Sequence, residues 1–225
     1  MRYEIKGIPF PVVICRLEQG EEICCQRGGM SWMSPNMQMT TNAGGSIGKA
    51  FSRAFSGESI FRNKYTAVGG EGEIAFTSSV PGNILVMELD GGKTIVAQKS
   101  AYLASSPSAE PSIFFQKKFG AGLFGGEGFI MQKFSGTGIV FLEIDGSTVE
   151  YDLAENESML VDTGYLAAMD STCRIDIETV KGAGNALFGG EGFFNTRISG
   201  PGHIWLQTMP ISALAGSIRR YIPSN

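Results

Sequence analysis

The sequence has few of the residues with which enzymes usually perform chemistry. Its single histidine, His203, cannot build a typical zinc site, because such a site needs several nitrogen or sulfur ligands held together. The four cysteines form no C-x-x-C pair, and no stretch matches a nucleophile elbow or a Walker-type phosphate-binding loop. These absences predict a protein that is not an enzyme and that binds no cofactor.

Positive charge and long apolar runs are also scarce. The chain has 18 basic and 22 acidic residues, and its net charge of −4 argues against nucleic acid as a partner. No window approaches the roughly 18 apolar residues that a membrane helix needs. The first fifteen residues, interrupted by Pro9 and Pro11, do not read as a signal peptide. Because the cysteines form no C-x-x-C pair and the neighbours Cys24 and Cys25 seldom bond to each other, we expect a reducing, cytoplasmic location.

Glycine, in contrast, is abundant, with 31 residues, while proline contributes only 9. The glycines follow no G-X-Y period, which argues against collagen, and they lie between short apolar and aromatic runs. Alternating runs such as Phe129–Phe134, separated by turn residues, are typical of an all-β sandwich or barrel.

One glycine-rich motif is repeated along the chain. GLFGGEGF at 122–129 recurs as ALFGGEGF at 186–193, and a G-x-G turn and an apolar run follow both copies. A weaker copy has GGEG at 69–72, 56 residues before the second GGEG. Three copies of one β unit predict a pseudo-threefold domain in which each copy buries a face that the others cover.

The expected fold is therefore an all-β double-stranded β-helix or β-sandwich of three similar units. We expect a single domain over 1–225, with repeats at approximately 8–88, 89–144 and 145–210 and a C-terminal helix in 211–225. The helix is predicted because Ile211, Leu214, Ile218 and Ile222 share one stripe.

A second amphipathic segment lies near 46–56, where Ile47, Phe51 and Phe55 recur at helical spacing beside Lys49 and Arg53. It is expected to be a short helical insertion or a mobile loop. Its apolar side chains suit either a weak contact with an anionic membrane surface or packing against the domain or another subunit.

Several motifs together resemble one known family. They are GESIF (57–61), Pro81-Gly82, GGEGF, DTGYLAAM (162–169) and GPGHIWLQT (200–208). The chain is similar over nearly its whole length to bacterial relatives of the "altered inheritance of mitochondria" biogenesis protein. The resemblance implies a fold grouped with the tryptophan RNA-binding attenuation protein, three similar β units and a tendency to oligomerise, and it implies no known activity. No Lys or Arg position is shared by all three copies, which argues against RNA binding.

Three repeated glutamates are the main candidate site. If the three GGEG motifs are equivalent, Glu71, Glu127 and Glu191 take equivalent places, and their carboxylates suit Ca²⁺ or Mg²⁺. The alternative is that each glutamate accepts hydrogen bonds from its own turn or points to solvent, and we favour that alternative.

The other candidates are interpreted as structural. His203 replaces Ile139 of the matching repeat and so belongs to a strand. Met30, Met33, Met37 and Met39, near Cys24 and Cys25, offer soft ligands for Cu(I), but we favour the simpler interpretation of a pliable apolar surface at a core or subunit contact.

The favoured function is a non-enzymatic scaffold or binding module that assembles into a homo-oligomer through sheet edges or apolar faces. Two alternatives remain open: a peripheral membrane organiser using the segment near 46–56, and a small-ligand or cation-binding β-helix protein using the repeated glutamates or His203.

Overall fold

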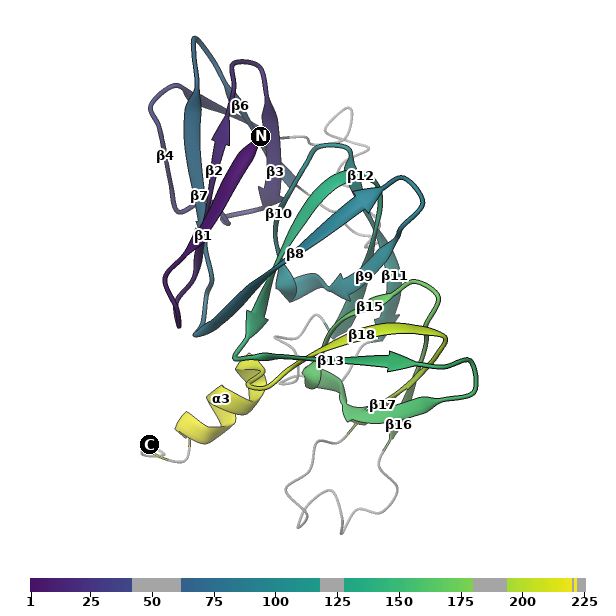
Figure 1. Cartoon of the computed structure of the whole chain (residues 1–225). Helices are drawn as coiled ribbons and strands as arrows, with labels where there is room; N and C mark the ends of the chain where they lie inside the picture. Colours follow the sequence, from purple (N-terminus) through teal and green to yellow (C-terminus); the bar gives the residue numbers. More distant parts are fainter. Residues whose placement is uncertain (42–61, 118–127, 180–193, 220, 222–225) are drawn as a thin grey trace, which may run out of the picture.

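The computed structural model describes residues 1–41, 62–117, 128–179, 194–219 and 221. These residues form β-strands, two short 3-10 turns and one α-helix near the C-terminus (Figure 1). The prediction of an all-β fold built from three similar units with a C-terminal helix is confirmed. The helical insertion expected near 46–56 lies outside the described residues.

The first unit contains six strands and is preceded by β1 (Arg2–Lys6), which pairs with its first strand. The six strands are β2 (Val12–Leu17), β3 (Glu22–Gln26), β4 (Trp32–Met33), β5 (Met37–Thr41), β6 (Arg62–Ala67) and β7 (Gly72–Thr77). The sixth strand pairs with the first and third, and the fifth pairs with the second and fourth. This pairing gives the unit two antiparallel layers with apolar side chains between them.

The other two units repeat this pairing plan. The second consists of β8 (Gly82–Asp90), β9 (Ile95–Gln98), β10 (Tyr102–Ser105), β11 (Ala109–Lys117) and β12 (Phe129–Asp145). The third consists of β13 (Thr148–Leu153), β14 (Ser158–Asp162), β15 (Leu166–Asp170), β16 (Arg174–Thr179), β17 (Phe194–Ser199) and β18 (Gly202–Gln207). In the second unit the long strand β12 serves as both fifth and sixth strand, since it pairs with β9 and β11 and then with β8 and β10.

The crossing of β12 between two layers depends on glycine. Gly136 and Gly138 have φ values of 97° and 106°, which side-chain-bearing residues rarely adopt. A Cβ atom at Gly136 would also overlap the carbonyl oxygen of Ser108. The G-x-G motif therefore bends one strand from one sheet into the next, where the sequence predicted a hairpin turn.

The unit boundaries differ from the predicted ones at the first repeat. The sequence assigned residues up to 88 to that repeat, but β8 pairs along its length with β12 and so belongs to the second unit. The first unit ends with β7 at Thr77.

The three units lie in a row (Figure 1). The described core consists of three clusters: the middle unit contributes Phe141 to the first cluster, and Phe129 and Met131 to the third. No described cluster combines side chains of the first and third units. The middle unit therefore joins its neighbours, and the expectation that each copy covers the other two holds only for the middle one.

The C-terminal helix α3 (Ile211–Arg219) begins where the Ile211 amide donates to Asp145 Oδ2 at 2.8 Å. Its predicted apolar stripe is not buried, because Ile211 and Ile218 are both about half exposed, at 52% and 51%. The helix therefore extends from the third unit instead of packing its stripe against it (Figure 1).

Candidate functional site

Neighbouring units are joined by one recurring contact between strands. The third strand of the second unit, β10, pairs antiparallel with the second strand of the first unit, β3. In the same way β15 of the third unit pairs with β9 of the second. Each junction therefore joins two layers from different units into one continuous sheet.

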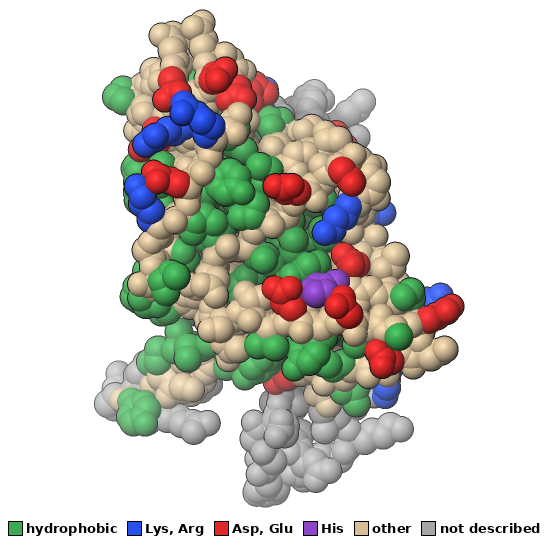
Figure 2. All heavy atoms as spheres, viewed as in Figure 1, with side chains coloured by type: hydrophobic (Ala, Val, Ile, Leu, Met, Phe, Trp, Pro, Cys, Tyr) green, Lys and Arg blue, Asp and Glu red, His purple; other side chains and the backbone are tan. Residues whose placement is uncertain are grey.

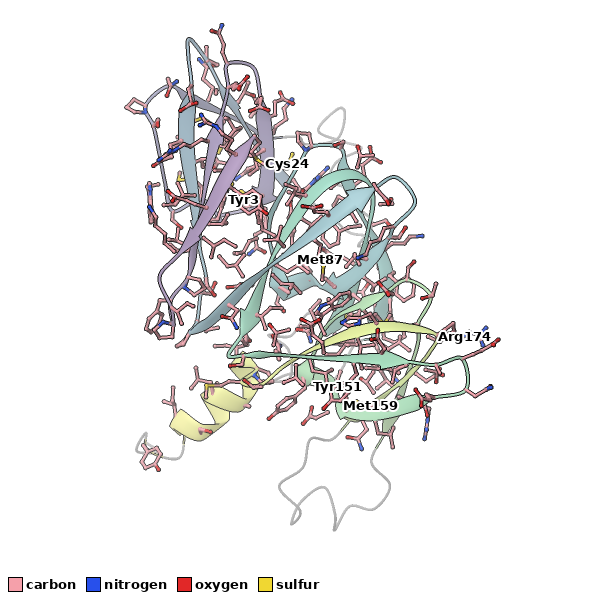
Figure 3. All side chains as sticks on the ribbon, in the orientation of Figure 1. Tyr3, Cys24, Met87, Tyr151, Met159 and Arg174 are labelled. Carbon is pink, nitrogen blue, oxygen red and sulfur yellow. The ribbon has the colours of Figure 1, made fainter. Side chains whose placement is uncertain are left out.

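The residues at the two junctions occupy matching positions. Ala104 lies opposite Cys25 at the first junction, and Ala168 lies opposite Ala97 at the second. All four side chains have no solvent exposure. Burial at these positions thus accompanies pairing between units, and Figure 3 shows the neighbouring Cys24 at the first junction.

The two strands that would continue this series have no partner across the corresponding edge in the described part of the chain. The third strand of the first unit, β4, pairs only with β7, and the second strand of the third unit, β14, pairs only with β17. Trp32 on β4 is 47% exposed and Leu160 on β14 is 51% exposed. Large apolar side chains on β4 and β14 are therefore exposed, although the equivalent positions of the junction strands are buried.

The two edge strands themselves contain no lysine or proline. Exposed edges in natural sheets typically contain lysine, proline or a covering loop. Strand β14 reads SMLVD and β4 reads WM. These two edges, named here the β4 edge and the β14 edge, are the candidate site.

Of the three repeated glutamates, the structure describes only Glu71. Glu71 lies between β6 and β7, where it forms an ion pair with Arg2. Glu127 precedes β12, and it lies outside the described residues, as does Glu191 before β17. The first GGEG thus occupies the turn between fifth and sixth strands, whereas the other two precede the fifth strand. The proposed equivalence of the three glutamates is wrong, because the weak first copy was aligned on the wrong glycine turn.

His203 lies on β18 between two carboxylates of the neighbouring strand β13. Its Nδ1 is 2.6 Å from Asp152 Oδ1 and its Nε2 is 3.0 Å from Glu150 Oε2. Figure 2 shows the histidine flanked by acidic side chains on the surface. The Trp205 ring packs beside the imidazole, with ring centroids 4.4 Å apart. Because both ring nitrogens face carboxylates, the protonated imidazolium is the form that donates both hydrogen bonds.

This arrangement predicts a raised histidine pKa. Partial burial lowers the pKa of His203, but hydrogen bonds and charges from Asp152 and Glu150 raise it by more, so it lies above the ordinary value. Because the pKa is raised, the protonated His203 stabilises the folded state through its two carboxylate partners. This contribution to the free energy of unfolding is complete below about pH 6.5 and is lost as pH rises through the folded-state pKa.

A proton NMR titration tests this, because the chain has one histidine and its ring signals need no assignment. We expect a pKa above 6.5 in the native protein, and a lower value when Asp152→Asn and Glu150→Gln are combined. Asp176→Asn, which removes one carboxylate from the separate strand β16, is the control and should leave the titration unchanged. A native pKa at or below that of the double variant would contradict the assignment.

The sulfur-containing side chains pack as apolar groups. Met37 is buried in the first core cluster, and Met30 and Met33 pack against it, whereas Met39 is exposed. All four cysteines are free and buried, and burial raises the pKa of Cys25 to about 11 and of Cys15 to about 12. Among the described residues, no group of three His, Cys, Asp or Glu side chains is placed to hold a metal. The apolar alternative to a Cu(I) site therefore describes the methionines better.

A cavity of about 590 Å³ lies beside the start of α3. Its lining includes Gln98, Asp145, Gln207 and Ala215. Gln207 donates to the Gly164 carbonyl and accepts from the Asp145 amide, so its polar atoms are already engaged. Gly128, the first described residue after 118–127, also lines this cavity. We assign no ligand to the cavity.

The predicted membrane or subunit contact residues Ile47, Phe51 and Phe55 lie outside the described residues.

Sequence reasoning missed the two edges, although the sequence does show that the second and third strands of each unit are equally spaced. Cys25 and Trp32, Ala97 and Ala104, and Val161 and Ala168 are each seven positions apart in the sequence. Where the interior third strands carry alanine, β4 carries tryptophan. Without the pairing pattern, nothing in the sequence indicates which of these strands lacks a neighbour.

The fold is shared with known proteins. A family model described as "Mitochondrial biogenesis AIM24" matches residues 3–209. An uncharacterised protein from Streptococcus pyogenes serotype M6 is 31% identical over 235 residues, which cover 100% of this chain and 92% of that protein. A crystal structure of another Streptococcus pyogenes protein has a TM-score of 0.80 at 29% identity and covers 98% of this chain and 99% of that one.

This is an all-β protein of three similar units, and the chain belongs to the AIM24 family. The family resemblance inferred from the sequence motifs is confirmed. In the described part of the chain, no helix has the length and apolar character needed to cross a bilayer.

Proposed function

We propose that this protein is a non-enzymatic scaffold that self-assembles. The observation that supports the proposal is the presence of two exposed apolar strand edges at positions where, inside the chain, another unit is bound. An exposed strand edge offers unpaired backbone amides and carbonyls as well as apolar side chains, and a second edge satisfies both.

The chemistry of the other candidate groups also favours a scaffold over an enzyme. The only histidine is engaged by Asp152 and Glu150, and the pKa of each cysteine is raised by burial, which keeps the thiols protonated near neutral pH. Free, buried thiols also suit the reducing cytoplasmic location that we propose for the protein.

Multi-angle light scattering coupled to size exclusion, run over a range of loading concentrations, tests self-assembly directly. We expect a mass that rises with concentration towards multiples of the 24.1 kDa chain. A mass of one chain at every concentration up to the solubility limit would contradict the proposal.

A further inference from the structure

We propose that β4 of one copy pairs antiparallel with β14 of a second copy, so that chains join head to tail in the way that units join within one chain. This inference rests on the proposed self-assembly and specifies its surface and its register. The occupant of each edge is thus a second copy of this chain.

The equivalence of positions comes from the strand pairing. Trp32 lies opposite Ala75 on β7, as Ala104 lies opposite Phe141 on β12 and Ala168 lies opposite Trp205 on β18. In the third unit Leu160 lies opposite Arg197, as Cys24 lies opposite Lys64 in the first unit and Val96 opposite Lys133 in the second. The expectation that no Lys or Arg position is shared by all three copies is therefore wrong, because the strand pairing puts these three basic residues at equivalent positions. The seven-residue spacing between second and third strands agrees with both sets of matches.

Both interior junctions predict the same register for the missing contact. The pair Ala104 and Cys25 corresponds to Trp32 and Val161, and so does the pair Ala168 and Ala97. One step along, the pairs Ser105–Cys24 and Met169–Val96 both correspond to Met33 and Leu160. Two independent junctions therefore place the same residues of β4 and β14 opposite one another.

The side chains at these positions are suited to burial against each other. Met33 and Val161 are partly buried, and Trp32 and Leu160 are about half exposed. The interior counterparts of all four are nearly or fully buried. Aromatic and β-branched pairs on opposite strands stabilise a sheet by a fraction of a kcal/mol to about 1 kcal/mol each.

The pairing would join the outer sheet of the first unit in one chain to the outer sheet of the third unit in another chain. The sheet β1-β2-β7-β4 of the first unit would continue into β14-β17-β16 of the next chain. The interior junctions build their continuous sheet by the same kind of merger. The contacts that stabilise the single chain are therefore repeated between chains, which favours a second copy over an unrelated partner.

The two edges belong to units at opposite ends of the row, as the positions of β4 and the labelled Met159 show (Figures 1 and 3). A contact between two different surfaces of identical chains is heterologous, and it leads to rings when the rotation closes and to filaments when it does not. The β4–β14 contact accordingly predicts an assembly larger than a dimer.

Disulfide trapping tests the register. Two double variants place cysteines at the expected opposite positions: Trp32→Cys with Val161→Cys, and Met33→Cys with Leu160→Cys. In an antiparallel pair one of the two positions has the closer, non-hydrogen-bonded geometry that a disulfide needs. We expect at least one variant to give a reducible ladder of chain multiples on non-reducing gels after mild oxidation.

Two controls accompany the trapping. Trp32→Cys with Met159→Cys is displaced by two residues and should cross-link far less, because diagonal neighbours are about 7–8 Å apart. The unsubstituted protein should give no ladder, since its four cysteines are buried. If neither matched variant exceeds the displaced control, the register is wrong.

Charge substitution separates this inference from self-assembly in general. Leu160→Glu and Met33→Lys, each at an exposed or half-buried edge, should each weaken association at least about tenfold. An equimolar mixture of the two variants should recover much of it through alternating chains, because a contact between two different variants has either the native pair or an opposite-charge pair, whereas a contact within one variant stays mismatched. Far-ultraviolet circular dichroism would show that both variants remain folded.

The outcomes are distinguishable. If the native protein associates and both charge variants associate equally well, the β4–β14 contact is wrong while self-assembly stands. If the native protein is a single chain at all concentrations, both proposals fail together. If association is lost in each variant and restored in the mixture, the head-to-tail contact is supported.

Discussion

Replacing Phe141 by alanine is expected to lower the free energy of unfolding by about 3–5 kcal/mol, the usual cost of removing a buried phenylalanine. Phe141 has no solvent exposure and belongs to the core cluster of the first unit, although its strand β12 belongs to the second. It also contacts Tyr3 of β1 edge-on, with ring centroids 5.1 Å apart. Its loss therefore weakens both a unit core and the connection between units.

Urea unfolding followed by tryptophan fluorescence measures the effect as a lower transition midpoint. Phe114→Ala is the matched control, because this phenylalanine on β11 is 38% exposed and its loss should cost below about 1 kcal/mol. Equal midpoints for the two variants would contradict the assignment of Phe141 to the core. A two-step transition confined to the Phe141→Ala variant would show that the first unit unfolds separately.

Replacing Gly136 by alanine is expected to cost at least about 3 kcal/mol, from two sources. An L-residue at a φ of 97° is strained by about 1–2 kcal/mol. In addition, the new methyl group would overlap the Ser108 carbonyl oxygen, which belongs to the backbone and cannot rotate away. The strand must then either shift from Ser108 or lose its bend between the two layers.

Gly20→Ala separates the two sources of that cost. Gly20 has a similar φ of 85°, but a Cβ atom there would meet nothing within 4 Å. Its replacement should cost only the backbone strain, about 1–2 kcal/mol. Thermal or urea unfolding of both variants provides the comparison. A Gly136→Ala variant as stable as Gly20→Ala would show that β12 does not depend on the close approach to Ser108.

Assembly through the β4 and β14 edges would also affect apparent stability. A partner that binds only the folded state raises the free energy of unfolding by mass action, so the unfolding midpoint would depend on protein concentration. Comparisons among variants therefore require matched concentrations. The Leu160→Glu variant offers a background in which unit stability can be measured with association weakened.

The register of the first repeat shows where sequence comparison reaches its limit. The GGEG at 69–72 matches the later copies letter by letter, yet it lies between β6 and β7 instead of before the fifth strand. Turns at different points in the strand order can have the same glycine-rich sequence, because each needs residues that tolerate positive φ. An identical motif therefore does not establish an equivalent position in the fold. The position of this GGEG became clear only from the pairing of β6 with β3 and β5, which identifies β6 as the fifth strand and places the GGEG after it.

The candidate site was hidden from sequence for a related reason. An apolar strand reads the same whether its edge is covered by a neighbouring unit or open to solvent, so Val96 on β9 and Leu160 on β14 look alike. Their burial differs because β15 covers β9 and no described strand covers β14 in that way. Pairing between units is a long-range property, and local patterns do not encode which copy stands at an end.

The sequence by itself determined the β class, the threefold repetition, the C-terminal helix and the family, because alternation, turn glycines, helical periodicity and ordered motifs are local features. Tertiary structure alone decided the row of units, the strand-crossing role of Gly136, the acidic setting of His203 and the two open edges. Each of these depends on which distant strands pair, and a β-sheet obtains those contacts from the whole chain.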